Sequence, residues 1–271
     1  MKIHLTLTAE KSGNICDLLA SETGISKMKI KDALQKGALS FKGKKDRKRR
    51  RLRRAKASVN PGDSIEFSYD DEILSLAPPL PELICDKGAY SVWMKPAGLM
   101  SQGTKYGDHC SILRQAELFF SSQRKVYPVH RLDREAEGVM VIAHTPEAAS
   151  KLSALFQEGK VDKTYEASVM GHPSPEKGTI EKPLDGKPAI SNYEVLTHDP
   201  ETGISSVRVK IKTGRYHQIR RHLDMIGHPI VGDSRYGKGN KNRDGLKLKA
   251  VSLGFRCPFS GKEVRFGISN Q

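Results

Sequence analysis

The spacing of apolar residues in the N-terminal part of the chain predicts two helices followed by short strands. Between residues 15 and 34 apolar side chains recur at helical intervals and are interrupted at Gly24, which is typical of two short helices. A strand-like run follows at residues 38–41, and a turn leads into alternating residues at 59–67. These elements predict a small mixed unit.

A proline-rich stretch ends this unit. Residues 77–83 contain three prolines and cannot continue a helix or a central strand. We therefore expect a small basic module at residues 1–76, a linker at residues 77–83 and a larger domain at residues 84–271.

The larger domain begins a pattern of alternating strands and helices. Residues 139–143 form a short apolar run, which is typical of a buried strand. Thr145 as N-cap and Pro146 at the first helical position then predict a helix, which Gly159 ends.

A second helix is predicted at residues 217–226. Ile219 and Leu223 recur at the spacing of an inward face, whereas Arg220 falls on another face. A solvated helix face is the simple interpretation of that arginine.

Charge narrows the choice of partner. The formal net charge is +15 and the pI is near 9.6, so the surface attracts RNA, DNA or an acidic membrane. Residues 42–56 hold eleven basic side chains opposed only by Asp46. Their mutual repulsion predicts a mobile, unpacked loop that engages phosphates, with a merely solubilising tract as the alternative.

Other sequence features exclude several classes of protein. No segment approaches the roughly 20 apolar residues that span a bilayer. The four cysteines are isolated from one another and lack the spacing of a zinc site, so we expect neither a metal nor disulfides. A protein of the reducing cytoplasm fits best.

Candidate chemistry begins at Asp133, which lies between Arg131 and Arg134 directly before the predicted buried strand. Neighbouring positive charge favours the ionised carboxylate. Gly138 would permit close approach of a ligand to the backbone. Taken alone, these residues favour a structural ion pair or a turn cap over catalysis.

Two further segments add to this site. Residues 212–222 place Gly214, cationic groups and hydrogen-bonding groups around a helix start, an arrangement that attracts phosphate. Tyr165, on the strand after the first helix, can stack on a base or reach a sugar, although a half-buried strand tyrosine is the simple alternative.

The order of these segments resembles the RluA-type pseudouridine synthases from Trp93 to Phe266. The matching motifs are Lys95-Pro96-Ala97-Gly98, His130-Arg131-Leu132-Asp133 with Gly138, Lys163-Thr164-Tyr165, residues 214–220, residues 227–233 and Cys257-Pro258.

The resemblance implies an α+β fold with a mixed, largely antiparallel central sheet, flanking helices and an RNA-binding cleft. It implies that Asp133 is the essential carboxylate, that Tyr165 packs on the base and that Arg220 pairs with Asp133. Arg131 would displace the target nucleotide, so that the base is flipped before it reacts. No metal or organic cofactor is implied. Glu137 stands where the family commonly has serine, and a second carboxylate in the cleft would oppose RNA binding.

A looser resemblance covers residues 14–68, which are similar to the RNA-binding module first known from small-subunit ribosomal protein four. This N-terminal module is expected to be a small α/β unit. Together the two parts predict RNA contacts from Lys95, His130, Arg131, Arg134, Arg215, His217 and Gln218 in the larger domain, and from Lys44, Lys45, Arg49, Arg50 and Arg51 in the basic run.

The predicted function is isomerisation of uridine in structured RNA, ribosomal RNA before transfer RNA, by a cytoplasmic monomer. Asp133 would act either as a nucleophile on the anomeric carbon or as a base on the neighbouring ribose carbon. The competing functions are a non-catalytic RNA-binding or ribosome-assembly protein with the same fold, and a base-flipping DNA glycosylase.

Overall fold

A computed structural model describes residues 1–238, 240, 242 and 244–267. The chain forms two compact units. The first comprises Met1–Pro78 and Gln102–Leu118, and the second comprises Pro79–Ser101 and Phe119–Gln271. The boundary at Pro78 falls in the proline-rich stretch, but residues 102–118 group with the first unit instead of the larger domain in which the sequence pattern placed them.

The first unit contains a four-stranded sheet in the order β1-β6-β3-β4 and a two-stranded sheet of β2 and β5. Gly24, at φ +70°, ends the first helix as expected. Its elements are β1 (Lys2–Thr8), β2 (Gly13–Asn14), α1 (Ile15–Thr23), α2 (Lys27–Gln35), β3 (Leu39–Lys42), β4 (Arg50–Arg51), β5 (Ser58–Val59), β6 (Ser64–Asp70) and α3 (Asp71–Ser75), with α4 (Ile112–Phe119) at the end of its second segment.

Part of the basic run is packed, contrary to the expectation of a free loop. Arg51 donates hydrogen bonds to the carbonyls of Gly37 and Thr104, and β4 pairs with β3. Leu52 is buried, and Arg53 forms an ion pair with Asp108. Carbonyls and one carboxylate thus offset part of the charge repulsion.

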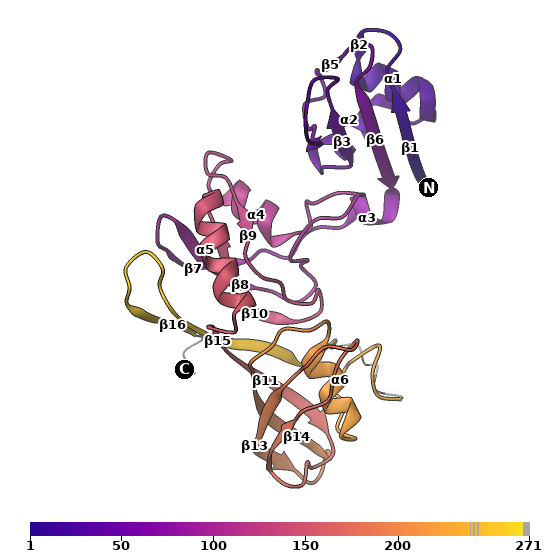
Figure 1. Ribbon diagram of the computed structural model, residues 1–271. Coiled ribbons are helices and arrows are strands. Elements are labelled where there is room, and N and C mark those ends of the chain that lie inside the picture. The colour runs from indigo at the N-terminus through magenta and orange to yellow at the C-terminus, as the bar shows by residue number, and fades with distance from the viewer. Residues whose placement is uncertain (239, 241, 243, 268–271) are drawn as a thin grey trace. The chain divides into compact units, whose positions relative to one another are not determined.

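The second unit is built on a ten-stranded sheet in the order β12-β13-β14-β11-β15-β10-β8-β7, with β16 on β15 and β9 on β10 (Figure 1). Its elements are β7 (Glu82–Asp86), β8 (Tyr90–Lys95), β9 (Tyr127–Pro128), β10 (Glu137–Ala143), α5 (Pro146–Gln157), β11 (Asp162–Met170), β12 (Lys177–Ile180), β13 (Ser191–Asp199), β14 (Ile204–Ile211), α6 (Gln218–Met225), β15 (Leu248–Arg256) and β16 (Glu263–Gly267).

This sheet is mixed and largely antiparallel, as predicted. Among the described residues β10 and β15 form the one parallel pair, and every other pairing is antiparallel. The predicted buried strand is β10, whose apolar side chains lie in a core with α5 and β15. The side chain of Thr145 caps α5 by accepting the Ala148 N–H at 3.0 Å. Local signals therefore placed both elements correctly.

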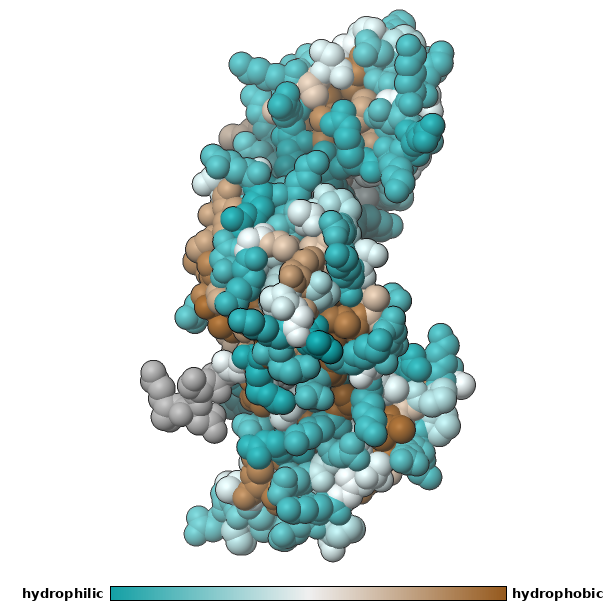
Figure 2. All heavy atoms as spheres, turned by 60° about the vertical axis from the view of Figure 1, so that its left-hand side comes forward, coloured by the Kyte–Doolittle hydropathy of each residue, from teal (hydrophilic) through white to brown (hydrophobic). Residues whose placement is uncertain are grey.

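Hydrophilic residues cover most of the face seen in Figure 2, with apolar residues in smaller groups among them. None of the helices within the described residues is long and apolar enough to cross a membrane.

Candidate active site

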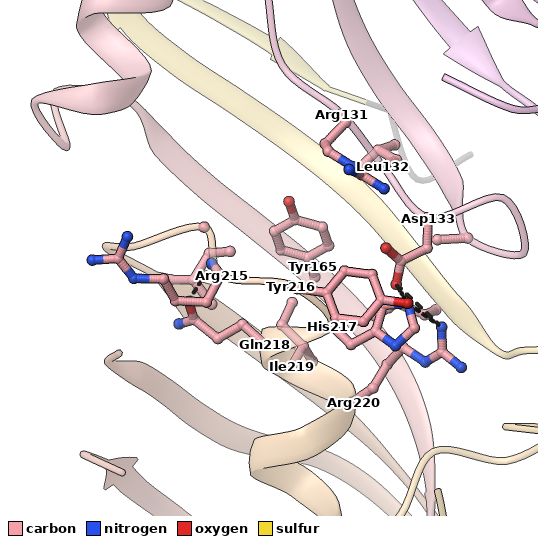
Figure 3. A pocket seen from close by; sticks show the side chains of 14 residues that line it. Arg131, Leu132, Asp133, Tyr165, Arg215, Tyr216, His217, Gln218, Ile219 and Arg220 are labelled. Atoms are coloured by element: carbon pink, nitrogen blue, oxygen red, sulfur yellow. Dashed lines mark hydrogen bonds and ion pairs between the residues drawn. The ribbon is translucent and has the colours of Figure 1, made fainter. Parts of the chain in front are cut away.

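A hollow of about 280 Å³ opens in the second unit between the segment before β10, strand β11 and the start of α6 (Figure 3). Its size lies near the lower end of typical small-ligand pockets. It brings together the three sequence segments that carried the candidate chemistry. The residues around it are Arg131, Leu132, Asp133, Ala136, Tyr165, Ile211, Gly214, Arg215, Tyr216, His217, Gln218, Ile219, Arg220 and Leu248.

Asp133 is held at the hollow by its neighbours in the chain. The Ser101 hydroxyl donates to the Leu132 carbonyl at 2.6 Å and accepts the Leu132 N–H at 2.9 Å. On the other side, the Lys95 ammonium and the Gly98 N–H both donate to the Arg134 carbonyl. These bonds fix the backbone on both sides of Asp133, whose side chain remains 18% exposed.

Arg220 approaches Asp133 from below, but its main partner is Asp233. Its Nε and Nη2 each donate to one oxygen of Asp233 at 2.7 Å, whereas its Nη1 donates to Oδ2 of Asp133 at 3.3 Å. Burial acts against the charge of Arg220, yet the carboxylates of Asp233 and Asp133 outweigh it and raise the pKa of Arg220. The guanidinium is therefore permanently charged and fixed.

The structure corrects the expected position of Arg220. Its side chain is 2% exposed, although helical periodicity placed it away from the inward face of α6. A buried guanidinium needs an anionic partner, and Asp233 supplies one from a segment beyond the helix. In the sequence, Asp233 stands out only as the last residue of the 227–233 motif. Its position directly after Gly232 was the one signal that it had a role.

His217 lies beside the same carboxylate in an unusual backbone conformation. Its φ of 51° and ψ of 33° are left-handed, which costs a non-glycine residue about 1 kcal/mol. Arg220 Nη1 is a donor only, so His217 Nε2 accepts from it at 3.2 Å, and Nδ1 carries the proton toward Tyr236 Oη. Burial lowers the pKa of His217, which keeps the ring neutral. Its Nε2 lies 3.7 Å from Oδ2 of Asp133.

Tyr165 lies across the hollow from Asp133 on β11 (Figure 3). The pairing of β11 with β15 shifts register between Thr164 and Tyr165, a bulge of the kind that redirects a side chain near a site. Burial, with a smaller effect of Asp133, raises the pKa of the Tyr165 phenol. The phenol therefore stays protonated and presents a neutral aromatic surface to the hollow.

Gly138 has a different role from the expected one. Its φ is +132°, and a Cβ atom there would lie 2.3 Å from the carbonyl oxygen of Ala250. Gly138 pairs with Ala250 on one side, and Tyr165 pairs with Ala250 on the other. Gly138 is thus needed because the backbone of β15 packs closely against it, and not because a ligand does.

Two expected RNA contacts are buried structural residues. Lys95 is 0% exposed, and its ammonium donates to the carbonyls of Pro96, Leu99 and Arg134. Gln218 is 3% exposed; its Oε1 accepts from Thr213 and Arg215, and its Nε2 donates to Ile190 and Ser191. Lys95 therefore shapes the loops beside the hollow instead of facing RNA, contrary to the prediction. Gln218 lines the hollow with its amide bonded to protein, so its contact with RNA stays a prediction.

Two other side chains differ from expectation in smaller ways. His130 is half-buried, stacks on Phe156 and accepts the Val141 N–H, and burial lowers its pKa to about 3. It therefore offers a neutral ring and no cation. Glu137 forms an ion pair with Lys249 at 3.1 Å. It does not line the hollow, so it does not place the expected second carboxylate there.

The remaining predicted contacts lie at the surface. Arg131 and Arg134 are exposed, whereas Arg215 is half-buried and its Nε donates to the Pro188 carbonyl. Arg131 and Arg215 line the hollow, and Arg131 has no hydrogen bond or ion pair to any described residue. In the first unit the exposed side chains are Lys44, Lys45, Arg49 and Arg50, whereas Arg51 is turned toward protein carbonyls. Within the described part of the chain no group of three or more metal-binding side chains is placed to hold an ion.

Comparisons with known proteins agree with this geometry. The family model described as RNA pseudouridylate synthase matches residues 89–225. The chain is 36% identical to the dual-specificity RNA pseudouridine synthase RluA of Escherichia coli, over 64% of this chain and 85% of that one. It is 34% identical to ribosomal large subunit pseudouridine synthase D of Zymomonas mobilis, over 51% and 50%.

A solved structure shares the fold of this chain. The structure of human RNA pseudouridylate synthase domain containing 1 superposes with a TM-score of 0.60 at 23% identity, over 72% of this chain and 86% of that one. From the family model that matches residues 89–225, the chain belongs to the RNA pseudouridylate synthase family. Within that family it is an RNA pseudouridine synthase of the RluA type, an isomerase.

Proposed function

We propose that Asp133 is the reacting carboxylate and that the hollow receives a uridine flipped out of structured RNA. The observation that carries this proposal is the uneven bonding of Asp133. Its Oδ2 is held by Arg220, while Oδ1 has no hydrogen bond or ion pair with any described residue. One oxygen is thus aimed and the other is free to act on the ribose.

Asp133 acts by one of two routes, and both need an ionised carboxylate. It attacks the anomeric carbon as a nucleophile, or it takes the proton from the neighbouring ribose carbon. In either case the bond from the anomeric carbon to N1 breaks and the base leaves with the electron pair. A bond from that carbon to C5 then forms: on the first route C5 displaces the Asp133 carboxylate, and on the second Asp133 returns its proton to the neighbouring ribose carbon. On both routes C5 loses its proton and N1 gains one.

The side chains around Asp133 have separate tasks in this proposal. Tyr165 packs against the base while it turns over, because its neutral ring faces the hollow. Arg131, exposed and without a partner among the described residues, fills the place that the flipped nucleotide leaves. Arg220 restrains Oδ2 of Asp133, and the neutral His217 ring, which accepts from Arg220 Nη1, helps to hold that guanidinium in place.

Ribosomal RNA is the proposed substrate, with transfer RNA as the alternative. A hollow of about 630 Å³ in the first unit is lined by Arg50, Arg53, Arg54 and Lys56, and the exposed part of the basic run lies beside it in the chain. Such a surface binds phosphates without reading sequence. The first unit is therefore proposed to be an RNA-binding module.

We also propose a monomer that acts in the cytoplasm. The second unit by itself supplies every side chain of the catalytic hollow, so no second copy is needed to complete the site. Cys16, Cys85 and Cys257 form no disulfide, which suits a reducing compartment.

The test maps pseudouridine by carbodiimide treatment or mass spectrometry in ribosomal and transfer RNA from cells with and without the gene. The purified Asp133→Asn variant is then given the RNA that loses a modification. We expect binding within about twofold of the parent and no product, because the change is nearly isosteric and removes the ionisable group. Product above that of a mock preparation would remove Asp133 from this role.

A further inference from the structure

A second hollow of about 540 Å³ adjoins the first in the same unit. The two share Arg131, Tyr165, Ile211, Gly214 and Arg215, so only this wall separates them. The far side of the second hollow is formed by the end of α5 and the loop after β14. A strand of RNA with one nucleotide beside Asp133 therefore has a second cavity within reach of its next nucleotide.

Lys163 gives the second hollow an unmatched positive charge. The residue is 6% exposed, and its ammonium has only the carbonyls of Lys212 and Thr213, at 3.4 and 3.3 Å, for partners among the described residues. A buried ammonium without a carboxylate is costly unless an anion joins it. A side chain at Gly214 would begin 4.0 Å from this ammonium, so glycine keeps the approach open.

Other charges around the second hollow point the same way. Arg131, Lys212 and Arg215 line it and are cationic. The acid on its rim, Glu158, already forms an ion pair with Lys160 at 2.6 Å. The net field inside the hollow therefore favours an anion.

An aromatic surface accompanies this charge. His130 and Phe156 both line the hollow, and their rings stack with centroids 4.3 Å apart and an angle of 12° between the planes. Both rings are half-buried and uncharged, since burial holds the pKa of His130 near 3. A flat neutral pair of this kind is a stacking surface that accepts any nucleobase.

We propose that the second hollow binds the nucleotide adjacent to the target uridine, with its phosphate on the Lys163 ammonium and its base on the His130–Phe156 pair. This inference rests on the proposed function, since it takes the first hollow as the place of the uridine. The contacts are sequence-tolerant, so the subsite holds the RNA strand in register while the uridine turns over.

The test follows backbone amides by NMR during titration with uridine 5′-monophosphate and with the trinucleotide ApUpA. The monophosphate should shift resonances around the first hollow. ApUpA should in addition shift residues 156–159 and 212–214 and bind at least fivefold more tightly. Lys163→Met should lose that gain and those added shifts, and Lys163→Arg should keep most of both.

Lys210→Met is the matched control, because Lys210 is an exposed lysine of β14 that does not line the second hollow. It should bind both probes as the parent does. Equal affinity of Lys163→Met and parent for ApUpA, or shifts confined to the first hollow, would overturn the subsite. If Lys163→Met does not fold, the parent's shift map and Lys163→Arg decide.

The two proposals fail separately. Shifts around the second hollow without any response of the first hollow to uridine 5′-monophosphate would count against the place of the uridine and still support a phosphate-and-base subsite. Shifts confined to the first hollow would support the place of the uridine and count against the subsite in the second hollow.

Discussion

Arg220 is bound more closely to Asp233 than to Asp133: two bonds of 2.7 Å join it to the former and one of 3.3 Å to the latter. The charges of Arg220 and Asp233 therefore largely cancel each other. Asp133 is oriented without being locked in a two-pronged ion pair, which would lower its reactivity. Asp233 thus positions Arg220 and, through it, the carboxylate that we propose to react.

Asp233→Asn tests this arrangement. The amide cannot accept two strong bonds, so Arg220 should turn toward Asp133 and misplace it. We expect the single-turnover rate to fall on the order of 10- to 100-fold with RNA affinity within about twofold. The free energy of unfolding should fall by about 3 kcal/mol, because a buried pair is broken.

The matched control is Glu135→Gln. Glu135 also approaches Arg220, at 3.9 Å, but its side chain is 49% exposed. Exposed ion pairs contribute about 0–1 kcal/mol, so its rate should stay within about threefold of the parent. Similar losses in Asp233→Asn and Glu135→Gln would show that Asp233 has no special role.

Gly138→Ala tests the strand crossing below the site. Its Cβ would overlap the backbone of Ala250, in a backbone conformation that already disfavours side chains. We expect a loss of at least about 3 kcal/mol in urea unfolding. Gly88→Ala, at φ +72° with no atom within 4 Å, should lose only about 1 kcal/mol. A small loss at Gly138 would mean that β15 can move away.

His130 predicts a pH dependence of stability. Its folded pKa of about 3 lies below the ordinary 6.5, so between these values the unfolded chain binds the extra proton. Stability should therefore fall as the pH drops through this window, by about 1–2 kcal/mol at pH 5 after allowance for partial exposure. His130→Phe should remove that part of the slope in urea unfolding at pH 5 and 7.5.

The control for this slope is His172→Phe, which removes an exposed histidine of the same unit. Its pH dependence should match that of the parent. If the free energy of unfolding falls equally in the parent and in His130→Phe between pH 7.5 and pH 5, His130 is protonated in the folded chain and the prediction is wrong.

The exposed part of the basic run should supply affinity and not chemistry. Neutralising Lys45, Arg47 and Lys48 to glutamine removes about three phosphate contacts. The slope of log affinity against log salt should then flatten by about 0.7–0.9 per contact. The single-turnover rate at saturating RNA should stay within about twofold.

An equal loss of charge elsewhere provides the comparison. Lys87, Lys210 and Lys262 are exposed in the second unit outside both hollows, and their glutamine variants should leave the salt slope nearly unchanged. If both triple variants flatten the slope alike, the basic run only adds to the overall charge. A collapsed saturating rate would place the run in the active site.

The sequence predicted what depends on local signals. The helix capped by Thr145, the strand at residues 139–143 and the helix after His217 are where short-range pattern placed them. The sequence motifs around Asp133, Tyr165 and Arg220 also identified the three segments that line one hollow in the structure.

What the sequence could not provide depends on partners far along the chain. From the sequence, Lys95 is predicted to be a surface cation, but in the structure its ammonium is surrounded by backbone carbonyls. Arg220 is likewise predicted to face solvent, but it is paired with Asp233. The same holds for Ser101, which carries no signal of its own and yet clamps Leu132 through both backbone groups. Burial of a polar side chain is a property of its surroundings, which local periodicity does not describe.

The position of β15 in the sheet also sets when the enzyme can become active. Strands β10 and β11 carry the two walls of the site, and β15 lies between them although it follows both by about eighty residues or more. During synthesis the ribosome releases β10 and β11 long before the strand that joins them. The nascent chain therefore has no competent site until residue 256 has emerged, so catalysis is excluded during most of translation.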